Sequence, residues 1–168
     1  MKFQNAFKFT LPAAALGILA LGLSPMPANA STATATFTVS TTIAATCVLS
    51  TTPLSFGTYS GLILQATATG SGTCTNTTPF NIGFSAGLAA GATVTTRRMT
   101  GPGGALLSYE LFSDTGRTIN WGTTIGTDTV ASTGTGATQT FTVYGQIPAG
   151  QFYQSGVYND TVTVTVTW

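Results

Sequence analysis

Apolar and polar residues alternate in short runs along most of the chain after residue 30, and turn residues separate the runs. A period of two is typical of β-strands, because successive side chains point to opposite faces of a sheet. The most regular run is the last, in which threonines alternate with Val162, Val164, Val166 and Trp168. Other runs predict strands within 31–43, 62–74, 80–84, 92–99, 107–111 and 141–143, with turns at 101–104 and 114–116. About seven or eight short strands predict an all-β fold, an antiparallel β-sandwich.

Composition supports an all-β fold and excludes several kinds of chemistry. Threonine and valine are abundant, and both are stiff side chains that suit strands. The 168 residues include no histidine, which excludes imidazole catalysis, a His-ligated zinc centre and a His-ligated haem. Charged residues make up only 5% of the chain, and the densest cationic cluster is the pair Arg97 and Arg98. This pair is too small to form a nucleic-acid surface.

The first thirty residues have the pattern of a secretory signal peptide. Lys2 and Lys8 precede an apolar stretch, and Ala28-Asn29-Ala30 forms a small-x-small cleavage site. A membrane-spanning helix is the alternative, but the stretch contains Pro12 and is shorter than the roughly 20 residues that a span needs. We therefore expect residues 1–30 to be removed on export.

The two cysteines, Cys47 and Cys74, both lie in the exported part. In an oxidising compartment such a pair forms one structural disulfide, which contributes about 2–4 kcal/mol to stability. Two separate reactive thiols are the alternative, but the sequence places no Lys, Arg or His beside either cysteine to lower its pKa.

Candidate catalytic groups are few. Glu110 and Asp114 are four residues apart, which places them about 13 Å apart on one face of a strand, too far for a glycosidase pair. Asp114 suits a capping role in the turn before Gly116, with Arg117 as its candidate partner. We predict no enzyme activity, no metal and no cofactor.

The terminal runs allow two interpretations. They can be two ordinary strands of one sandwich, or they can be edges that pair with other chains, because an open strand edge favours such pairing. The alternation alone does not distinguish these alternatives.

Several blocks in the C-terminal half resemble the spore coat protein U domain family. They occur in the family's order and are Tyr109–Asp114, Arg117-Thr118, Trp121-Gly122, Phe141–Gln151 and Gly156–Val166. The resemblance extends from about Phe37 to Trp168 and includes Cys47 between Thr46 and Val48.

The resemblance implies a subunit of an archaic, Csu-like chaperone–usher pilus of a Gram-negative bacterium. Such subunits are incomplete immunoglobulin-like sandwiches, and a donor strand from another subunit completes them by β-augmentation. The implied domains are a donor-strand extension at 31–45 and a pilin sandwich at 46–168, after the signal peptide at 1–30. The implied donor residues are Phe37, Val39, Thr41 and Ile43, of which Thr41 departs from the expected apolar pattern and marks a shallow pocket or a starting point for strand exchange.

On the acceptor side, the resemblance implies a groove lined by Val162, Val164 and Val166. Trp168 and the terminal carboxylate are the expected contact for the chaperone. The expected partners are neighbouring pilins, a periplasmic chaperone and an outer-membrane usher, and the fibre would support adhesion and biofilm formation at the cell surface. The alternatives are a monomeric secreted carbohydrate-binding sandwich and a structural protein of a coat layer.

Overall fold

The computed structural model of the protein describes residues 28–168, and its compact unit spans Thr41–Trp168. Residues 28–46 form no helix or strand, and all of them are exposed. The predicted signal peptide, except for Ala28–Ala30, lies outside the described residues. Within the described part of the chain, no helix is long and apolar enough to cross a membrane.

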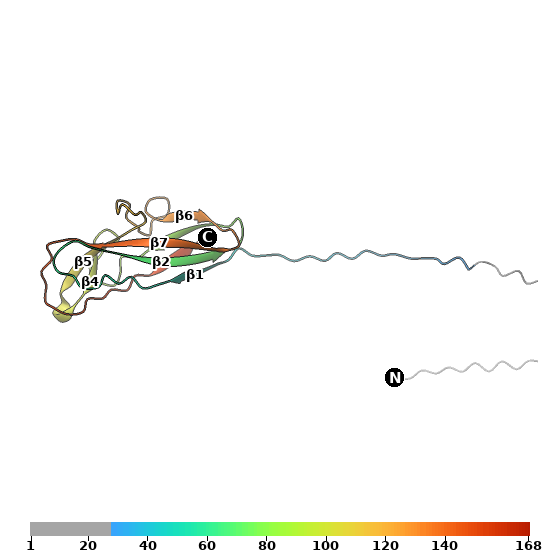
Figure 1. The fold of residues 1–168 in the computed structure, drawn as a ribbon. Coiled ribbons are helices and arrows are strands. Elements are labelled where there is room, and N and C mark those ends of the chain that lie inside the picture. The colour runs from blue at the N-terminus through green and yellow to red at the C-terminus, as the bar shows by residue number, and fades with distance from the viewer. Residues whose placement is uncertain (1–27) are drawn as a thin grey trace, which may run out of the picture. The chain divides into compact units, whose positions relative to one another are not determined.

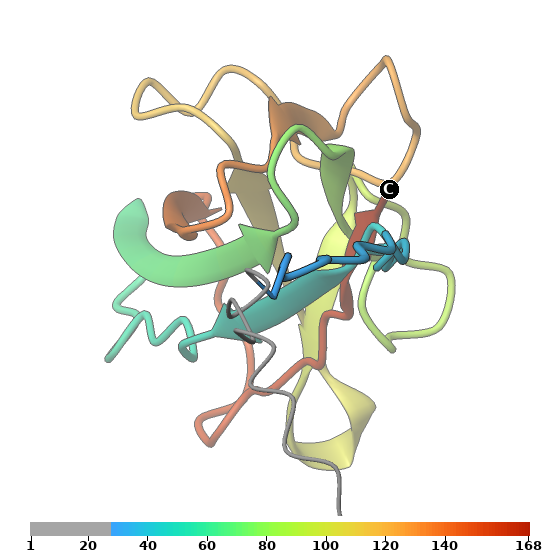
Figure 2. The same ribbon diagram turned by 90° about the vertical axis from the view of Figure 1, so that its right-hand side faces the viewer.

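The compact unit is an all-β sandwich with eight strands in the described residues, as the alternation predicts (Figures 1 and 2). The strands are β1 (Cys47–Thr51), β2 (Leu64–Cys74), β3 (Pro79–Phe84), β4 (Arg97–Thr100), β5 (Leu106–Phe112), β6 (Val130–Thr133), β7 (Thr138–Ile147) and β8 (Val164–Thr167). One sheet has the order β1-β2-β7-β5-β4, and the other has the order β6-β3-β8. Every pairing between these strands is antiparallel.

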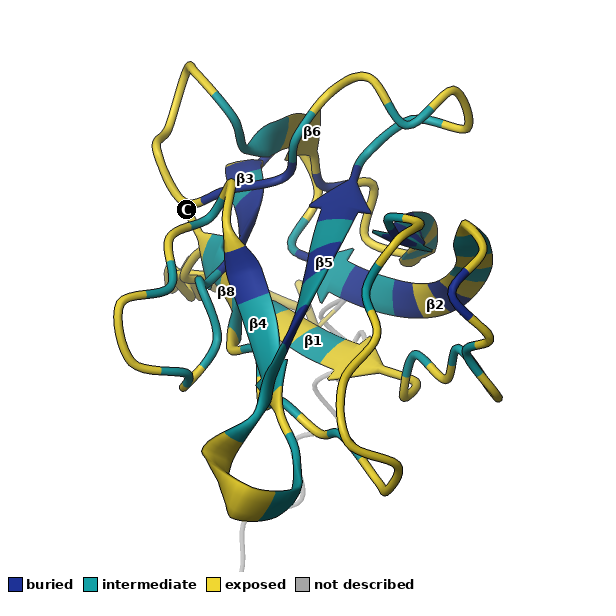
Figure 3. Ribbon diagram, turned by 90° about the vertical axis from the view of Figure 1, so that its left-hand side faces the viewer, coloured by how far each residue is buried: buried dark blue, intermediate teal, exposed yellow. Residues whose placement is uncertain are grey.

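The core lies between the sheets and consists mainly of the alternate side chains of β3, β5 and β7, together with Cys74 and Trp121. Figure 3 shows buried residues on β3 and β5. The centre of the core is an aromatic cluster in which the Trp121 ring lies 4.6 Å from the Phe84 ring and 5.7 Å from the Phe141 ring. The Trp121 indole N–H donates to the Ile82 carbonyl oxygen at 2.8 Å. Trp121 therefore fills the core without leaving a buried donor unpaired.

Two glycines allow large side chains to pack against the central strands. A Cβ atom on Gly70 of β2 would collide with the Phe141 ring, and one on Gly145 of β7 would collide with Leu54 and Phe56. Leu54 and Phe56 belong to the segment after β1, which has no regular secondary structure. The missing side chain at Gly145 therefore lets this segment cover one end of the core.

Arg97 is the buried cation of the fold, with none of its surface exposed. Its guanidinium group donates to four main-chain carbonyl oxygens at distances of 2.6 to 2.8 Å. These carbonyls belong to Phe84, Ser85, Val94 and Trp121. Burial lowers the pKa of Arg97, and the nearby Tyr109, Asp128 and Asp160 oppose this effect. Arg97 thus ties the end of β3 to two loops.

Most of the predicted strands are confirmed, but the run predicted within 31–43 forms no strand in the single chain, and the strand predicted at 92–99 is wrong over most of its length. Strand β4 begins only at Arg97. The preceding residues form a turn, in which the Thr93 N–H donates to the Thr96 hydroxyl and the two hydroxyls lie 2.8 Å apart. Local threonine hydrogen bonds therefore compete successfully with the sheet there. The alternation also does not predict β1 and β6.

Replacing Arg97 tests the importance of this network. We expect Arg97→Met to lower the free energy of unfolding by about 3 kcal/mol or more, because it leaves several buried carbonyls without a donor. Arg98→Met is the matched control, since Arg98 is adjacent, half-buried and outside this network, and we expect about 0.5 kcal/mol or less. Urea unfolding of the mature protein measures both values, and equal midpoints would contradict this role for Arg97.

Candidate functional site: an open sheet edge and its groove

The candidate site is the edge of β8 that faces away from β3. Strand β8 is the last strand of its sheet, and its register pairs Phe84 with Val164 and Gly83 with Thr165. The Ser85 N–H donates to the Thr163 carbonyl oxygen at 2.9 Å, so the odd-numbered residues of this segment bond towards β3. Because antiparallel ladders alternate, the N–H and C=O groups of Val162, Val164 and Val166 point towards the open edge.

The same three valines turn their side chains inwards. They are half-buried and pack against the core, whereas Thr161, Thr163, Thr165 and Thr167 are exposed. The one-sided alternation predicted for this segment is therefore present, although β8 itself covers only Val164–Thr167. Upstream, Asn159 exchanges main-chain hydrogen bonds with Thr100 of β4. The edge thus extends from Tyr158 to Val166.

The edge strand β1 of the other sheet lies across from β8, and its partner in the described residues is β2. At one end the two edges meet, because the Trp168 indole N–H donates to the Ala45 carbonyl oxygen at 3.3 Å. Trp168 is otherwise exposed. The Cys47–Cys74 disulfide, with an S–S distance of 2.04 Å, joins β1 to β2, which confirms the predicted pairing.

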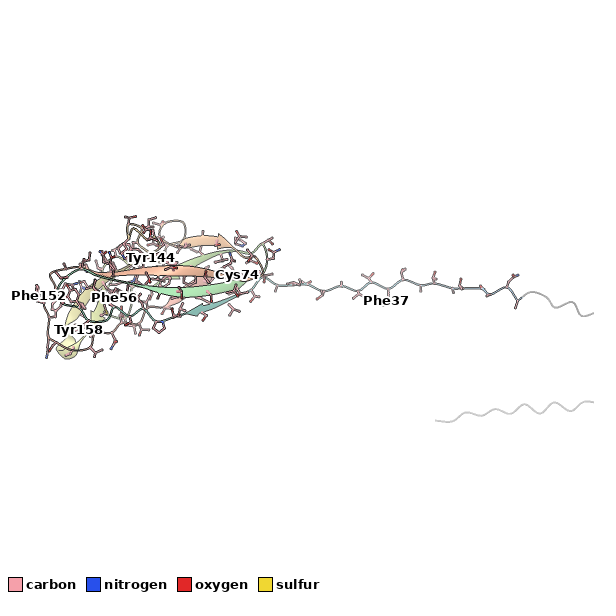
Figure 4. The ribbon with its side chains drawn as sticks, viewed as in Figure 1. Phe37, Phe56, Cys74, Tyr144, Phe152 and Tyr158 are labelled. Atoms are coloured by element: carbon pink, nitrogen blue, oxygen red, sulfur yellow. A yellow bond between two sulfur atoms is a disulfide. The ribbon has the colours of Figure 1, made fainter. Side chains whose placement is uncertain are left out.

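A groove separates the two edges and reaches the core. Its cavity has a volume of about 460 Å³. One wall is Thr51–Leu54 with Phe56, and the other is Tyr158–Val162 with Val164. The floor includes Ala68, Phe84 and Val143. A second cavity of about 880 Å³ adjoins the first and shares Leu54, Phe56, Met99, Tyr158 and Asn159 with it. Figure 4 shows Phe56, Tyr158 and Phe152 towards the end of the compact unit that is farther from Cys74.

One polar cluster interrupts the apolar lining of the groove. The Tyr109 hydroxyl donates to Asp160 Oδ2 at 2.6 Å, and the N–H groups of Leu88 and Thr161 donate to Asp160 Oδ1 at 2.8 Å. Burial, and then the hydrogen bond to Asp160, raise the pKa of Tyr109 well above its usual range. The phenol therefore stays protonated and keeps donating to the carboxylate. The sequence does not reveal this cluster, because Tyr109, Leu88 and Asp160 are distant from one another in the chain.

The implied donor residues are all exposed in the single chain. Phe37, Val39 and Ile43 are all more than 80% exposed, and Thr41 is also exposed. None of them belongs to a strand. The segment that contains Phe37–Ile43 therefore has the alternation of a strand but no ladder partner in the described residues. The edge of β8, in turn, has no strand beside it in that part of the chain.

The prediction that Arg117 pairs with Asp114 is wrong. The Arg117 guanidinium group donates to the carbonyl oxygens of Gly145 and Thr115 and lies 5.7 Å from the centre of the Tyr144 ring. Asp114 does cap its turn, because it accepts hydrogen bonds from the N–H groups of Thr118 and Ile119. These bonds, that from Ile119 above all, lower the pKa of Asp114.

The sequence analysis also missed the wall formed by Leu54 and Phe56. The alternation of Pro53-Leu54-Ser55-Phe56 is a signal that could have identified it, because the two apolar residues face the core. Within residues 28–168, no group of three or more acidic or cysteine side chains could hold a metal ion. The open edge and the groove beside it are suited to binding an extended chain segment.

Comparison with known proteins assigns the family. Residues 33–165 match the Spore Coat Protein U domain, so the chain belongs to the spore coat protein U domain family. The family consists of structural, non-enzymatic proteins. Protein U of Myxococcus xanthus is 43% identical over 76 residues, which are 45% of this chain and 42% of that protein. The chain therefore matches less than half the length of this curated relative.

Two solved structures show related folds. One is the complex of the chaperone CsuC with the tip adhesion subunit CsuE from the archaic chaperone–usher Csu pili of Acinetobacter baumannii. The match has a TM-score of 0.58 and 21% identity over 76% of this chain and 40% of that chain. The other is HdaB, the minor tip subunit of the E. coli Hda pilus, with a TM-score of 0.34 and 19% identity over 72% of this chain and 79% of that chain. The first supports an immunoglobulin-like fold.

Reducing the disulfide tests whether it holds the β1 wall of the groove. Since β1 has a partner strand on one side only within residues 28–168, we expect reduction to speed amide exchange at Val48–Thr51 more than at Leu107–Leu111 in β5. The expected loss of global stability is about 2–4 kcal/mol. Residue-resolved hydrogen exchange with and without reductant measures the difference, and a uniform increase in both strands would argue against a local role.

Proposed function

We propose that this chain is a structural subunit of a surface fimbria, assembled along the chaperone–usher route by donor-strand exchange. The observation that carries this proposal is the open edge at Val162, Val164 and Val166, whose main-chain groups point away from β3, beside a groove that reaches the core. Unpaired main-chain groups beside apolar side chains favour the addition of a strand.

The segment 31–45 supplies a strand of suitable character. Its large apolar side chains Phe37, Val39 and Ile43 share one face and are exposed in the single chain. Burial of each is worth roughly 1.5–3 kcal/mol, and a ladder of main-chain hydrogen bonds adds to this. The pilin domain at 46–168 then accepts the extension of the next subunit. Because this contact is heterologous and does not close on itself, it produces a filament.

The partners follow from this mechanism. Before assembly a periplasmic chaperone would cover the groove, with Trp168 and the terminal carboxylate at the contact, and an outer-membrane usher would pass the subunits to the surface of a Gram-negative cell. The complex of CsuC and CsuE, in which a chaperone binds a pilus subunit, supports this route by its related fold. Adhesion and biofilm formation would be properties of the assembled fibre.

Deleting the extension tests the function. The mature chain and a variant lacking residues 31–43 are each co-produced with a chaperone of an archaic pilus and are examined by negative-stain microscopy and unheated denaturing electrophoresis. We expect filaments and a detergent-resistant ladder from the mature chain, and single chaperone-bound subunits from the variant.

The contrary results identify the alternatives. Two equally stable soluble monomers without chaperone would show that the sandwich is complete by itself, as in a carbohydrate-binding protein. Sheets or irregular layers that form without residues 31–43 would indicate a coat protein.

A pair of substitutions tests which face of the extension is buried. We expect Val39→Asp to reduce the assembled fraction about tenfold or more, because a carboxylate would enter the apolar groove without a partner. Thr38→Asp is the matched control, since it adds the same charge one residue away on the opposite face, and it should assemble normally. Quantifying the detergent-resistant ladder gives both values, and equal losses would show that this alternation does not govern assembly.

A further inference from the structure

We propose a specific register for the donor segment, in which Thr41 of one copy lies opposite Asp160 of the next and fixes the alignment. This inference rests on the proposed function and deepens it. The occupant of the groove is residues 33–43 of a second copy, antiparallel to residues 158–168. We choose the antiparallel direction because every strand pair in the described residues is antiparallel, and antiparallel ladders are the more stable.

The positions of large and small side chains favour this register. In an antiparallel ladder, directly opposed residues point to the same face. With Thr41 opposite Asp160, the apolar residue Val39 lies opposite Val162 and Phe37 lies opposite Val164. Both valines line the cavity of about 460 Å³.

Ile43 then lies opposite Tyr158, which lines both this cavity and the adjoining one of about 880 Å³. All three large side chains of the donor therefore meet residues that line a cavity.

Small side chains of the donor meet the part of the edge where the cavity ends. Ala35 lies opposite Val166, and Ala33 lies opposite Trp168. Val166 is half-buried against the core and Trp168 is exposed, and neither lines the cavity. The donor thus has alanine where there is no room to fill and larger residues where there is.

The polar residue of the donor meets the polar point of the groove. Asp160 accepts three hydrogen bonds, from Tyr109, Leu88 and Thr161, and it lines the cavity. A carboxylate has about four acceptor positions, so Oδ2 can accept one more hydrogen bond. The Thr41 hydroxyl of the incoming copy donates to it. A valine or isoleucine at this position would instead bury part of a carboxylate against hydrocarbon.

The neighbouring register lacks this agreement. A shift by two residues places Ile43 against Asp160, Thr41 against Val162 and Phe37 against Val166. The large ring would then lie beyond the cavity, and an apolar side chain would cover the carboxylate. Thr41 is the polar residue on the inward face of the donor segment, and Asp160 is the carboxylate that it meets in the groove. This pair therefore selects the register.

Cysteine cross-linking tests the register. The cysteines replace exposed residues, so the inward-facing side chains of the donor and of the groove stay unchanged. In the proposed register Thr38 lies opposite Thr163, and both side chains are exposed. Because the main-chain groups of Thr163 point towards β3, Thr38 and Thr163 form a non-hydrogen-bonded pair in this register. The Cα atoms of such a pair are about 4.5 Å apart, which is within disulfide range. The shifted register brings Thr38 opposite Thr165 instead.

We therefore compare filaments of the full mature chain carrying Thr38→Cys with Thr163→Cys and Thr38→Cys with Thr165→Cys. We expect a disulfide-linked ladder on non-reducing gels, after heating in detergent, from the first pair only. Thr38→Cys alone is the control for links between filaments.

The outcomes separate this proposal from the proposed function. Filaments that cross-link through the second pair, or through neither pair, overturn the register and leave donor-strand assembly in place. An unsubstituted mature chain that forms no filaments overturns both.

A second substitution tests the contact itself. We expect Thr41→Val filaments to dissociate about tenfold faster or more than the parent, because a hydrogen bond to a charged group is lost. Thr42→Val, the adjacent substitution on the outer face, should leave the rate unchanged. Dissociation is measured as loss of the detergent-resistant ladder with time at fixed temperature. An unchanged rate for Thr41→Val would overturn the role of the Thr41 and Asp160 contact.

Discussion

The structure depends on a main-chain constraint at the last strand. Every buried peptide group needs a hydrogen-bond partner. In β8, only the main-chain groups that point towards β3 have such a partner. The groups of Val162, Val164 and Val166 point away from β3, towards the open edge beside a groove that reaches the core. A chain with such an edge gains stability from an added strand, and the exposed alternation of residues 33–43 suits that role.

The open edge is held in shape by polar contacts that do not involve the added strand. Arg97 fixes the carbonyl groups of Phe84 and Ser85, which lie at the end of β3 beside β8. Asp160 holds Leu88 and Tyr109, so it anchors the start of the edge to the neighbouring loop and to β5. These contacts hold the groove in shape before a strand is added. The conformational-entropy cost of adding the strand is therefore lower.

The sequence predicted the parts of the fold that depend on alternation. Strands β2, β3, β5 and β7 follow the runs of apolar residues, and the disulfide follows from the cysteine pair in an exported chain. Strand β1 could not be found in this way, because its apolar Val48 faces solvent and is 68% exposed.

The candidate site was predicted only in part. Its row of inward-facing valines follows from the alternation, whereas the proposed donor residues and their groove are expectations that come from the family resemblance. In the sequence Arg97 looks like a surface cation, yet it is completely buried, because carbonyls from the end of β3, from the turn before β4 and from Trp121 converge on it. The contact between Tyr109 and Asp160 likewise joins residues 51 positions apart, and only the folded chain brings them together.

The most direct test of the open edge is residue-resolved hydrogen exchange along β8. In filaments, the amides of Val162, Val164 and Val166 should exchange as slowly as those of Thr163 and Thr165, which bond towards β3. In an isolated subunit lacking residues 31–43, the valine amides should exchange fast while the threonine amides remain protected. Valine amides that are already protected in that isolated subunit, or that still exchange fast in filaments, would contradict the account.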